Sequence, residues 1–243
     1  MVEWRPHVLA SVESTQDEVR LVAEKGEVEG YVIQAFQQKG GKGRSGNQWS
    51  SPMGNLYMSF LLRPNCGLDR AGELAFVIGL GLSSAFDDYI DADKHDKRLK
   101  WPNDVLIDGL KISGILLESV IEQNKLSGVI VGMGVNILNS PDLAICLNKV
   151  ATDAVYVNKV RDNILDKVGK TYDLWQEQGF APIRDMWLKQ AYNLGEPITA
   201  RLPSEKHKGI FKGINEEGSL LLEMSDGEVK IIHAADVHFG DVK

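Results

Sequence analysis

The sequence has few cysteines and no long apolar run. Its two cysteines, Cys66 and Cys146, lie far apart in 243 residues, which predicts neither a disulfide framework nor a paired metal site and favours a reducing compartment. No apolar run reaches the ~18 residues of a membrane-spanning helix, and residues 1–7 contain no apolar core of a signal peptide. We therefore expect a cytoplasmic protein with no membrane partner.

Positive charge is the scarcer kind. The chain has 27 Lys and Arg against 34 Asp and Glu, a net charge of -7. Proteins that bind nucleic acid over a broad surface usually carry the opposite balance. We therefore expect no nucleic-acid partner, and any site for an anion must be local.

The signatures of several enzyme classes are also missing. The five histidines show no H-x-x-x-H or H-E-x-x-H spacing, and neither G-x-S-x-G nor G-x-x-x-x-G-K-[ST] occurs. These absences disfavour zinc hydrolases, α/β-hydrolases and P-loop nucleotidases. Gly79 and Gly81 lack the third glycine of a dinucleotide-binding turn, so we interpret them as helix-packing residues.

What the sequence does contain predicts an α+β fold. Hydrophobic residues make up 43% of the chain, enough for a sizeable core. Apolar residues at helical spacing predict helices, and short β-prone runs between turn residues predict a mixed, largely antiparallel sheet flanked by those helices. The expected helices cover residues 17–25, 73–90, 158–175 and 182–187, and the expected strands cover residues 31–37, 55–62, 98–101, 105–107, 112–118 and 129–135.

The pattern changes near residue 195. Beyond it, short β-prone runs at residues 198–202, 208–214, 219–224 and 228–233 follow one another with tight turns between them. Close spacing of this kind is typical of a small β-barrel of about 50 residues. We predict two domains, residues 1–194 and residues 195–243.

The densest chemical signal is the string G-G-K-G-R-S-G-N-Q-W at residues 40–49. Its glycines allow the backbone to fold closely around a ligand, and Lys42 and Arg44 bring positive charge. An anion-binding loop is one interpretation. A solvated, flexible hairpin is the other, and this string alone leaves both open.

A second signal is K-W-P-N-D at residues 100–104, followed seven residues later by Lys111. If Asp104 ends one strand and Lys111 begins the next, the hairpin would bring a carboxylate and an ammonium to the same side of a pocket. A metal-binding Asp beside a charge-neutralising Lys suits phosphate chemistry. From spacing alone, a surface ion pair is the more common explanation.

A third signal, G-M-G-V-N at residues 132–136, ends a predicted strand. Small residues there permit the close approach of a planar ring, and the amide of Asn136 can pair with an adenine edge. Plain strand termination explains the string equally well.

In this order the strings resemble those of the biotin protein ligases, also called biotin–acetyl-CoA-carboxylase ligases. Residues 14–16 resemble the family's S-T-N, residues 38–49 resemble Q-x-x-G-R-G-R-x-G-x-x-W, and residues 100–104 match K-W-P-N-D outright. Residues 111–116 resemble K-[LIV]-[AS]-G-I-L, and residues 132–136 resemble G-x-G-[IV]-N. With the small C-terminal barrel included, the resemblance covers nearly the whole chain.

Two positions depart from the family pattern. Lys42 stands where the family has Arg, which keeps the charge and loses the planar fork of a guanidinium. Gln16 stands where the family has Asn, so its amide is carried on a longer side chain.

The resemblance implies a class II synthetase-like core with an SH3-like C-terminal domain. It also implies a ligase that activates biotin with ATP and Mg²⁺ as biotinyl-5'-adenylate. The biotinyl group would then pass to a lysine of a biotin carboxyl carrier protein, a part of acetyl-CoA carboxylase or of another biotin-dependent carboxylase. Because the motifs begin at Ser14, we expect a monofunctional ligase without the DNA-binding domain of the family's repressors. A homodimer is left open.

The same resemblance assigns roles to individual residues. Lys111, Arg44 and Asp104 are the catalytic candidates, and Asp104 is also the candidate metal ligand. The biotin-binding candidates are Ser14, Thr15, Gln38, Lys42, Lys111, Gly114 and Ile115. The nucleotide-binding candidates are Gly41, Gly43, Arg44, Trp49, Asn103 and Asn136.

Two other functions remain to be compared. A lipoate or octanoate ligase or transferase shares the implied fold and a pocket lysine, although K-W-P-N-D and a glycine loop that ends in Trp49 favour biotin. A non-enzymatic regulator is the second alternative, and the acidic balance of the chain counts against it.

Overall fold

The computed structural model describes residues 1–202, 205–233 and 235–239. Its first seven strands are β1 (Arg5–Leu9), β2 (Tyr31–Ala35), β3 (Leu56–Leu62), β4 (Lys97–Lys100), β5 (Asp104–Ile107), β6 (Leu110–Glu122) and β7 (Lys125–Val135). The helices are α1 (Thr15–Ala23), α2 (Leu74–Phe86), α3 (Val157–Gln178) and α4 (Phe180–Lys189), with short 3₁₀ turns at Arg44–Gly46, Leu68–Glu73 and Leu147–Lys149. The last strands are β8 (Pro197–Arg201), β9 (Lys206–Ile214), β10 (Leu220–Glu223), β11 (Val229–Ile232) and β12 (Asp236–Phe239).

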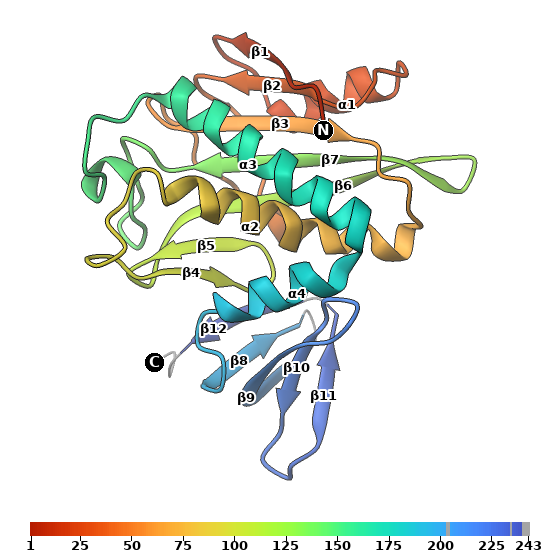
Figure 1. The fold of residues 1–243 in the computed structure, drawn as a ribbon, viewed down its shortest axis with the longest axis vertical. Coiled ribbons are helices and arrows are strands. Elements are labelled where there is room, and N and C mark those ends of the chain that lie inside the picture. The colour runs from red at the N-terminus through yellow and green to blue at the C-terminus, as the bar shows by residue number, and fades with distance from the viewer. Residues whose placement is uncertain (203–204, 234, 240–243) are drawn as a thin grey trace.

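The strands form two sheets (Figure 1). The larger has the order β1-β2-β3-β7-β6-β5-β4, and the smaller, at the C-terminal end, has the order β11-β10-β9-β8-β12. In the larger sheet β1 and β2 run parallel, and the other neighbouring strands run antiparallel. The smaller sheet is antiparallel throughout. The predicted mixed, largely antiparallel sheet with a small C-terminal β-domain is confirmed.

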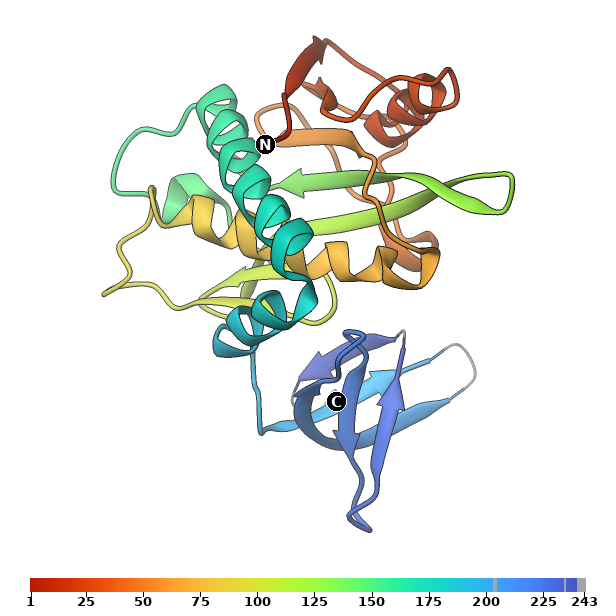
Figure 2. The ribbon, with the colours of Figure 1, turned by 45° about the vertical axis from the view of Figure 1, so that its right-hand side comes forward.

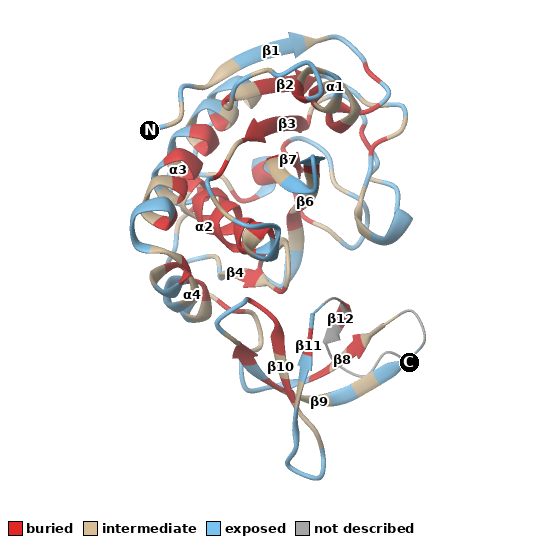
Figure 3. Ribbon diagram, turned by 90° about the vertical axis from the view of Figure 1, so that its right-hand side faces the viewer, coloured by how far each residue is buried: buried red, intermediate tan, exposed pale blue. Residues whose placement is uncertain are grey.

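The alternation of side chains along β3 separates the two faces of the larger sheet. Phe60 belongs to the main core, which the sheet shares with α2 and α3, whereas Leu61 packs in a smaller cluster with Val19 of α1. Figure 3, a view from the side, shows α2, α3 and α4 along one face of the sheet. The opposite face, beside the N-terminus of α1, carries the cavity described below.

Helices α2 and α3 approach closely at a glycine. A Cβ atom at Gly81 would lie 2.7 Å from the Cα of Val168 and 2.8 Å from the Oγ1 of Thr171, so only glycine fits there without a shift of α3. At Gly79 the nearest atoms would be side-chain carbons of Leu99 and Ile115, at 3.8 and 3.9 Å. The packing role predicted for the two glycines is confirmed at Gly81.

The C-terminal sheet packs on the rest of the molecule, below α4 in Figure 2, and its buried residues belong to the same hydrophobic cluster as those of α2. The indole N–H of Trp101 donates to the carbonyl of Gly218 (3.0 Å), and a Cβ atom at Gly218 would lie 2.6 Å from the ring of Phe76. Arg184 of α4 donates to the carbonyl of Ile214 (2.9 Å). The domain boundary at residue 194 stays a prediction.

The edges of the larger sheet differ. The outer edge of β4 is covered, because the N–H of Leu99 donates to the carbonyl of Gln190 and its carbonyl accepts from the N–H of Tyr192, both at 2.8 Å. At the other edge, β1 is half-buried or exposed along its length and contains Pro6. The sequence analysis missed β1, because a strand without a buried face shows no apolar alternation.

Both cysteines are free, in agreement with the prediction that the chain has no disulfide framework. Partial burial raises the pKa of the Cys66 thiol, so this side chain is held in its neutral form.

The two glycines of α2 provide a matched test of helix packing. We expect Gly81→Ala to lower the free energy of unfolding by ~1–3 kcal/mol, because the new methyl group overlaps the α3 backbone. Gly79→Ala should instead raise it by up to ~1 kcal/mol, since alanine favours a helix and meets only ordinary contacts there. Urea unfolding of both variants measures the difference, and equal effects would contradict this account of the α2–α3 contact.

Candidate functional site

A cavity of about 350 Å³ lies on the α1 side of the larger sheet. The start of α1, the glycine loop of residues 39–54, the turn between β4 and β5, and the middle of β6 and β7 all contribute to its wall. The lining residues are Ser14, Thr15, Gln16, Gln38, Lys42, Gly43, Arg44, Asn47, Gln48, Trp49, Ser59, Lys100, Trp101, Pro102, Asn103, Asp104, Lys111, Gly114, Ile115, Leu116, Gly132, Met133, Gly134 and Val237. Residues far apart in the sequence thus meet in one site.

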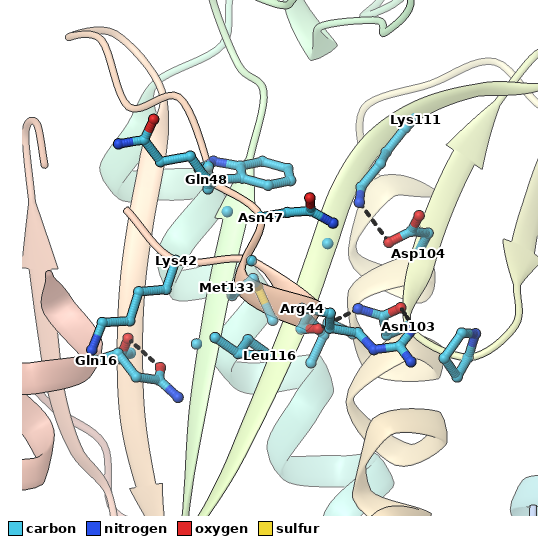
Figure 4. Close-up of a pocket in the computed structure, with 18 of the residues that line it drawn as sticks. Gln16, Lys42, Arg44, Asn47, Gln48, Asn103, Asp104, Lys111, Leu116 and Met133 are labelled. Atoms are coloured by element: carbon cyan, nitrogen blue, oxygen red, sulfur yellow. Dashed lines mark hydrogen bonds and ion pairs between the residues drawn. The ribbon is translucent and has the colours of Figure 1, made fainter. Parts of the chain in front are cut away.

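A carboxylate and an ammonium face each other on one side of this cavity (Figure 4). The Nζ of Lys111 lies 2.7 Å from the Oδ1 of Asp104, and the side chains are 35% and 16% exposed. The hairpin from β5 to β6 carries both residues, as its spacing predicted. Because Asp104 is largely removed from water, the pair differs from a surface ion pair, and loss of one partner would leave a charge poorly solvated.

Arg44 ties the glycine loop to two other parts of the chain. Its Nη1 donates to the Oδ1 of Asn103 (3.2 Å), which Figure 4 shows, and its Nη2 donates to the carbonyl of Ala235 (3.5 Å). Val237 of β12 also lines the cavity. The C-terminal sheet therefore contributes to the site, a contribution that the sequence analysis missed because nothing in the local pattern places β12 beside the glycine loop.

The polar end of the cavity is built on the first turn of α1. Ser14 caps the helix and accepts from the N–H of Gln16 (3.2 Å). The N–H and hydroxyl of Thr15 donate to the Oε1 of Gln38, at 2.8 and 3.0 Å, and the hydroxyls of Thr15 and Ser59 lie 2.8 Å apart. Since Ser14, Thr15, Gln16 and Ser59 are buried, this end offers hydroxyl and amide groups that water screens little.

The longer side chain of Gln16 fits because β7 has no side chain at Gly132. The Oε1 of Gln16 accepts from Ser59 (3.1 Å), and its Nε2 lies 3.4 Å from the carbonyl of Ile130. A Cβ atom at Gly132 would lie 2.2 Å from that Oε1. The departure from the family's S-T-N is therefore accommodated by a glycine on the neighbouring strand.

The planar ring that approaches the strand glycines is the protein's own Trp49. A Cβ atom at Gly134 would lie 2.3 Å from the Cε2 of the indole, and one at Gly114 would lie 3.2 Å from its Cζ3. The Nζ of Lys111 lies 5.2 Å from the ring centroid, within the range of a cation–π contact. The indole Nε1 is buried and has no hydrogen-bond partner among the described residues.

The loop that carries Trp49 is closed at its base. The N–H of Trp49 donates to the carbonyl of Gly41 (2.9 Å), and a Cβ atom at Gly41 would lie 2.4 Å from the carbonyl oxygen of Trp49. Beyond the loop, the hydroxyl of Tyr57 donates to the carbonyl of Pro52 (2.7 Å). Burial raises the pKa of Tyr57 to about 12, so this donor stays protonated even at an alkaline pH where an exposed tyrosine would ionise.

The remaining site residues predicted from the sequence differ in whether they line the cavity. Lys42 lines the cavity and forms an ion pair with Asp17 of α1. Gly41 and Asn136 do not line it, and the Nδ2 of Asn136 lies 3.5 Å from the carbonyl of Lys111. The other candidates named from the sequence all line the cavity.

Several lining residues were not among the candidates. Gln16 belongs to the string of residues 14–16, and Ser59 belongs to the buried strand β3. Their position opposite Gly132 is what marks both as site residues. No group of three or more His, Cys, Asp or Glu that could hold a metal ion occurs within residues 1–202, 205–233 and 235–239. In the same part of the chain, no helix is both long enough and apolar enough to span a membrane.

This sheet, with its glycine-lined cationic cavity and a small C-terminal β-domain, has the architecture of a carboxylate-activating protein ligase. Residues 8–136 match the profile described as "Biotin/lipoate A/B protein ligase family", and residues 194–240 match the "Biotin protein ligase C terminal domain". The first match covers just over half of the chain. The chain therefore belongs to the biotin/lipoate protein ligase family, on its biotin protein ligase branch.

Individual relatives agree with this placement. A biotin–[acetyl-CoA-carboxylase] ligase of Paracoccus denitrificans is 38% identical, over 96% of this chain and 100% of the relative. A bifunctional ligase/repressor of Bacillus subtilis is 32% identical, over 93% of this chain and 71% of the relative. The structure of the biotin protein ligase from Aquifex aeolicus in complex with biotin and ATP superimposes with a TM-score of 0.82 at 27% identity, over 97% and 99% of the two chains.

The contact between Gln16 and Gly132 yields a paired test. Gly132→Ala should displace the Gln16 amide and lower the free energy of unfolding by ~1–3 kcal/mol, because the methyl group overlaps its oxygen. The added change Gln16→Asn shortens that amide by one methylene and should recover at least ~0.5 kcal/mol of the loss. Urea unfolding of the wild type, the two single variants and the double variant measures the coupling free energy between the two positions. Additive changes in the free energy of unfolding would contradict the proposed contact.

Proposed function

We propose that the chain is an ATP-dependent biotin–protein ligase that makes biotinyl-5'-adenylate and transfers the biotinyl group to a lysine of a carrier protein. The observation that supports this most directly is the single cavity in which Lys111, Asp104 and Arg44 lie opposite the polar end at Thr15 and Gln38. One end suits reacting anions. The other suits a neutral group with both hydrogen-bond donors and acceptors, such as the ureido ring of biotin.

In the first step a carboxylate oxygen of biotin attacks the α-phosphorus of ATP, and the bond to the β-phosphate breaks with release of pyrophosphate. Two anions meet, so preorganised cations must offset their repulsion and the charge that develops on phosphorus. Lys111 and Arg44 supply this charge in our proposal. Asp104 holds the Lys111 ammonium in place before substrate arrives, through the 2.7 Å ion pair.

In the second step the amine of the carrier lysine attacks the carbonyl carbon of the mixed anhydride. An amide forms, AMP leaves, and the amine loses its proton. Asp104 is the sole carboxylate among the described residues that line the cavity. We therefore assign to it the orientation of the incoming amine as well as its contact with Lys111.

The ureido ring of biotin would bind among Ser14, Thr15 and Gln38, with the backbone of Gly114 and Ile115 as a further wall. Burial of these groups means that a ring lacking a donor or an acceptor would leave one of them unpaired, which is a strong basis for selectivity. Lys42 would join the biotin site by exchanging its contact with Asp17 for one with the ligand.

The nucleotide would lie against Trp49, whose buried indole N–H has no partner among the described residues and offers a donor. Gly41 and Gly43 let the loop fold closely, and Asn103 positions Arg44. Asn136 stays our candidate for the adenine edge. Closure of the loop over the adenylate would exclude water from a hydrolysable anhydride.

Mg²⁺ fits this site as a partner of substrate phosphates. Mg²⁺ usually binds through one or two carboxylates together with phosphate oxygens and water, and Asp104 offers one such carboxylate. Bound there, it would supply further positive charge to the phosphates of ATP.

The relatives named above are biotin ligases, and the C-terminal match is to a biotin protein ligase domain, so a lipoate or octanoate substrate is not favoured. We propose a biotin carboxyl carrier protein as the partner and the cytoplasm as the compartment. A homodimer, if formed through the larger sheet, would use β1, because β4 is covered. No nucleic-acid partner is proposed, given the net charge of -7.

The decisive assay combines the protein with biotin, ATP, Mg²⁺ and a carrier domain. We expect the carrier to gain the mass of one biotinyl group and pyrophosphate to appear only when biotin is present. Removal of Mg²⁺ with a chelator should suppress both signals. Lipoate in place of biotin is the matched control, and efficient transfer of lipoate would overturn the proposed substrate.

Within the same assay, Lys111→Ala should slow adenylate formation by ~10²–10³-fold, because the step loses one preorganised charge. Lys125→Ala, at the exposed start of β7, is the control for the loss of a lysine elsewhere. Pyrophosphate release by Lys111→Ala at the rate of the control would refute the assignment.

A further prediction concerns the retention of the adenylate. Hydrogen bonds to charged groups contribute ~1.5–3 kcal/mol each, so Arg44→Gly should weaken retention by about one to several powers of ten, at ~1.4 kcal/mol per decade. The variant should still make adenylate through Lys111 and should label lysines on an unrelated bystander protein. Ser45→Gly is the control, since residue 45 has a φ of 54° that suits glycine. If Arg44→Gly retained the adenylate as well as wild type, Arg44 would not be the residue that holds it.

A further inference from the structure

Trp49 is held at two points, by its ring and by its backbone. The ring lies on Gly134 and Gly114, as described above. The carbonyl oxygen accepts from the hydroxyl of Ser51 (3.0 Å). Ser51 is 9% exposed and is absent from the residues that line the cavity. It therefore contacts Trp49 from within the glycine loop, without contacting the space where substrate would bind.

Ser51 is the last side chain in a series of hydrogen bonds that begins at the polar end of the cavity and ends at the Trp49 carbonyl. The N–H of Thr15 donates to the Oε1 of Gln38 (2.8 Å), and the Nε2 of Gln38 donates to the hydroxyl of Ser51 (2.9 Å). A backbone N–H can only donate, so the end of the Gln38 amide that faces Thr15 must be its oxygen. The amide nitrogen then faces Ser51, whose single hydroxyl hydrogen is directed to Trp49.

The direction of this chain is thus set by chemistry along its whole length. The hydroxyl of Thr15 adds a branch, because it lies 3.0 Å from the Oε1 of Gln38 and 2.8 Å from the hydroxyl of Ser59 and can donate to one of them at a time. A ligand that hydrogen-bonds to Thr15 or Gln38 changes which donors and acceptors remain for the Gln38 amide. Any turn of that amide changes the partner of Ser51.

We propose that Ser51 is a positioning residue that links the biotin end of the cavity to Trp49. The link runs from Thr15 through Gln38 to Ser51 and on to the Trp49 carbonyl. This inference rests on the proposed function for the identity of the two ligands. Ser51 touches neither ligand, and it sets where the indole lies when biotin is bound and so how well the nucleotide is held.

The test compares Ser51→Ala with Ser50→Ala, an exposed neighbour in the same loop. We expect Ser51→Ala to raise the KM for ATP at least about fivefold, the change that corresponds to the ~1 kcal/mol of one hydrogen bond. Its Kd for biotin should stay within about threefold of wild type. The change in Trp49 fluorescence on adding biotin, assigned by its loss in Trp49→Phe, should disappear in Ser51→Ala and persist in Ser50→Ala.

Two further measurements separate the alternatives. Ser51→Cys keeps the size of the side chain with a weaker donor and should give an intermediate KM for ATP, which also covers a failure of Ser51→Ala to fold. An unchanged KM and fluorescence response in Ser51→Ala would overturn the link, as would equal losses of biotin and ATP binding. If the wild type itself neither binds biotin nor releases pyrophosphate with it, the proposed function fails instead.

Discussion

Three glycines on adjacent strands create the space in which the site is built. A Cβ atom would lie 2.2 Å from the Gln16 amide at Gly132, 2.3 Å from the Trp49 ring at Gly134 and 3.0 Å from the Lys111 ammonium at Gly114. Side chains from α1, the glycine loop and β6 therefore lie directly on the backbone of the sheet. The polar end of the cavity, the Trp49 ring and the Lys111 ammonium thus all lie against positions that carry no side chain.

The charge of the cavity is opposite to that of the whole molecule. Among the residues that the structure describes, its lining contains Lys42, Arg44, Lys100 and Lys111 against the single carboxylate of Asp104, in a chain with a net charge of -7. Positive charge concentrated in a partly closed site attracts anions locally, while the acidic exterior does not. The ion pair between Lys111 and Asp104 also offsets the cost of removing these two charges from part of their water.

Much of the fold was predictable because its signals are local. The apolar stripe of residues 73–90 predicted α2 at Leu74–Phe86, and the turn residues between short β-prone runs predicted the hairpin that joins Asp104 to Lys111. The sequence analysis missed β1, whose residues are exposed or half-buried, and β12, which pairs with the distant β8. It also missed Ser59, because a buried serine in a strand looks the same whether or not it faces a cavity.

The sequence by itself determined which residues are candidates for the site, because the strings at residues 40–49, 100–104 and 132–136 can be recognised without knowing how they meet in the fold. Only the tertiary structure decided that the ring lying on the strand glycines is Trp49 and that Arg44 reaches the carbonyl of Ala235. Such contacts join residues far apart in the chain. Their geometry depends on how two sheets and a loop pack together, which no local pattern of side chains records.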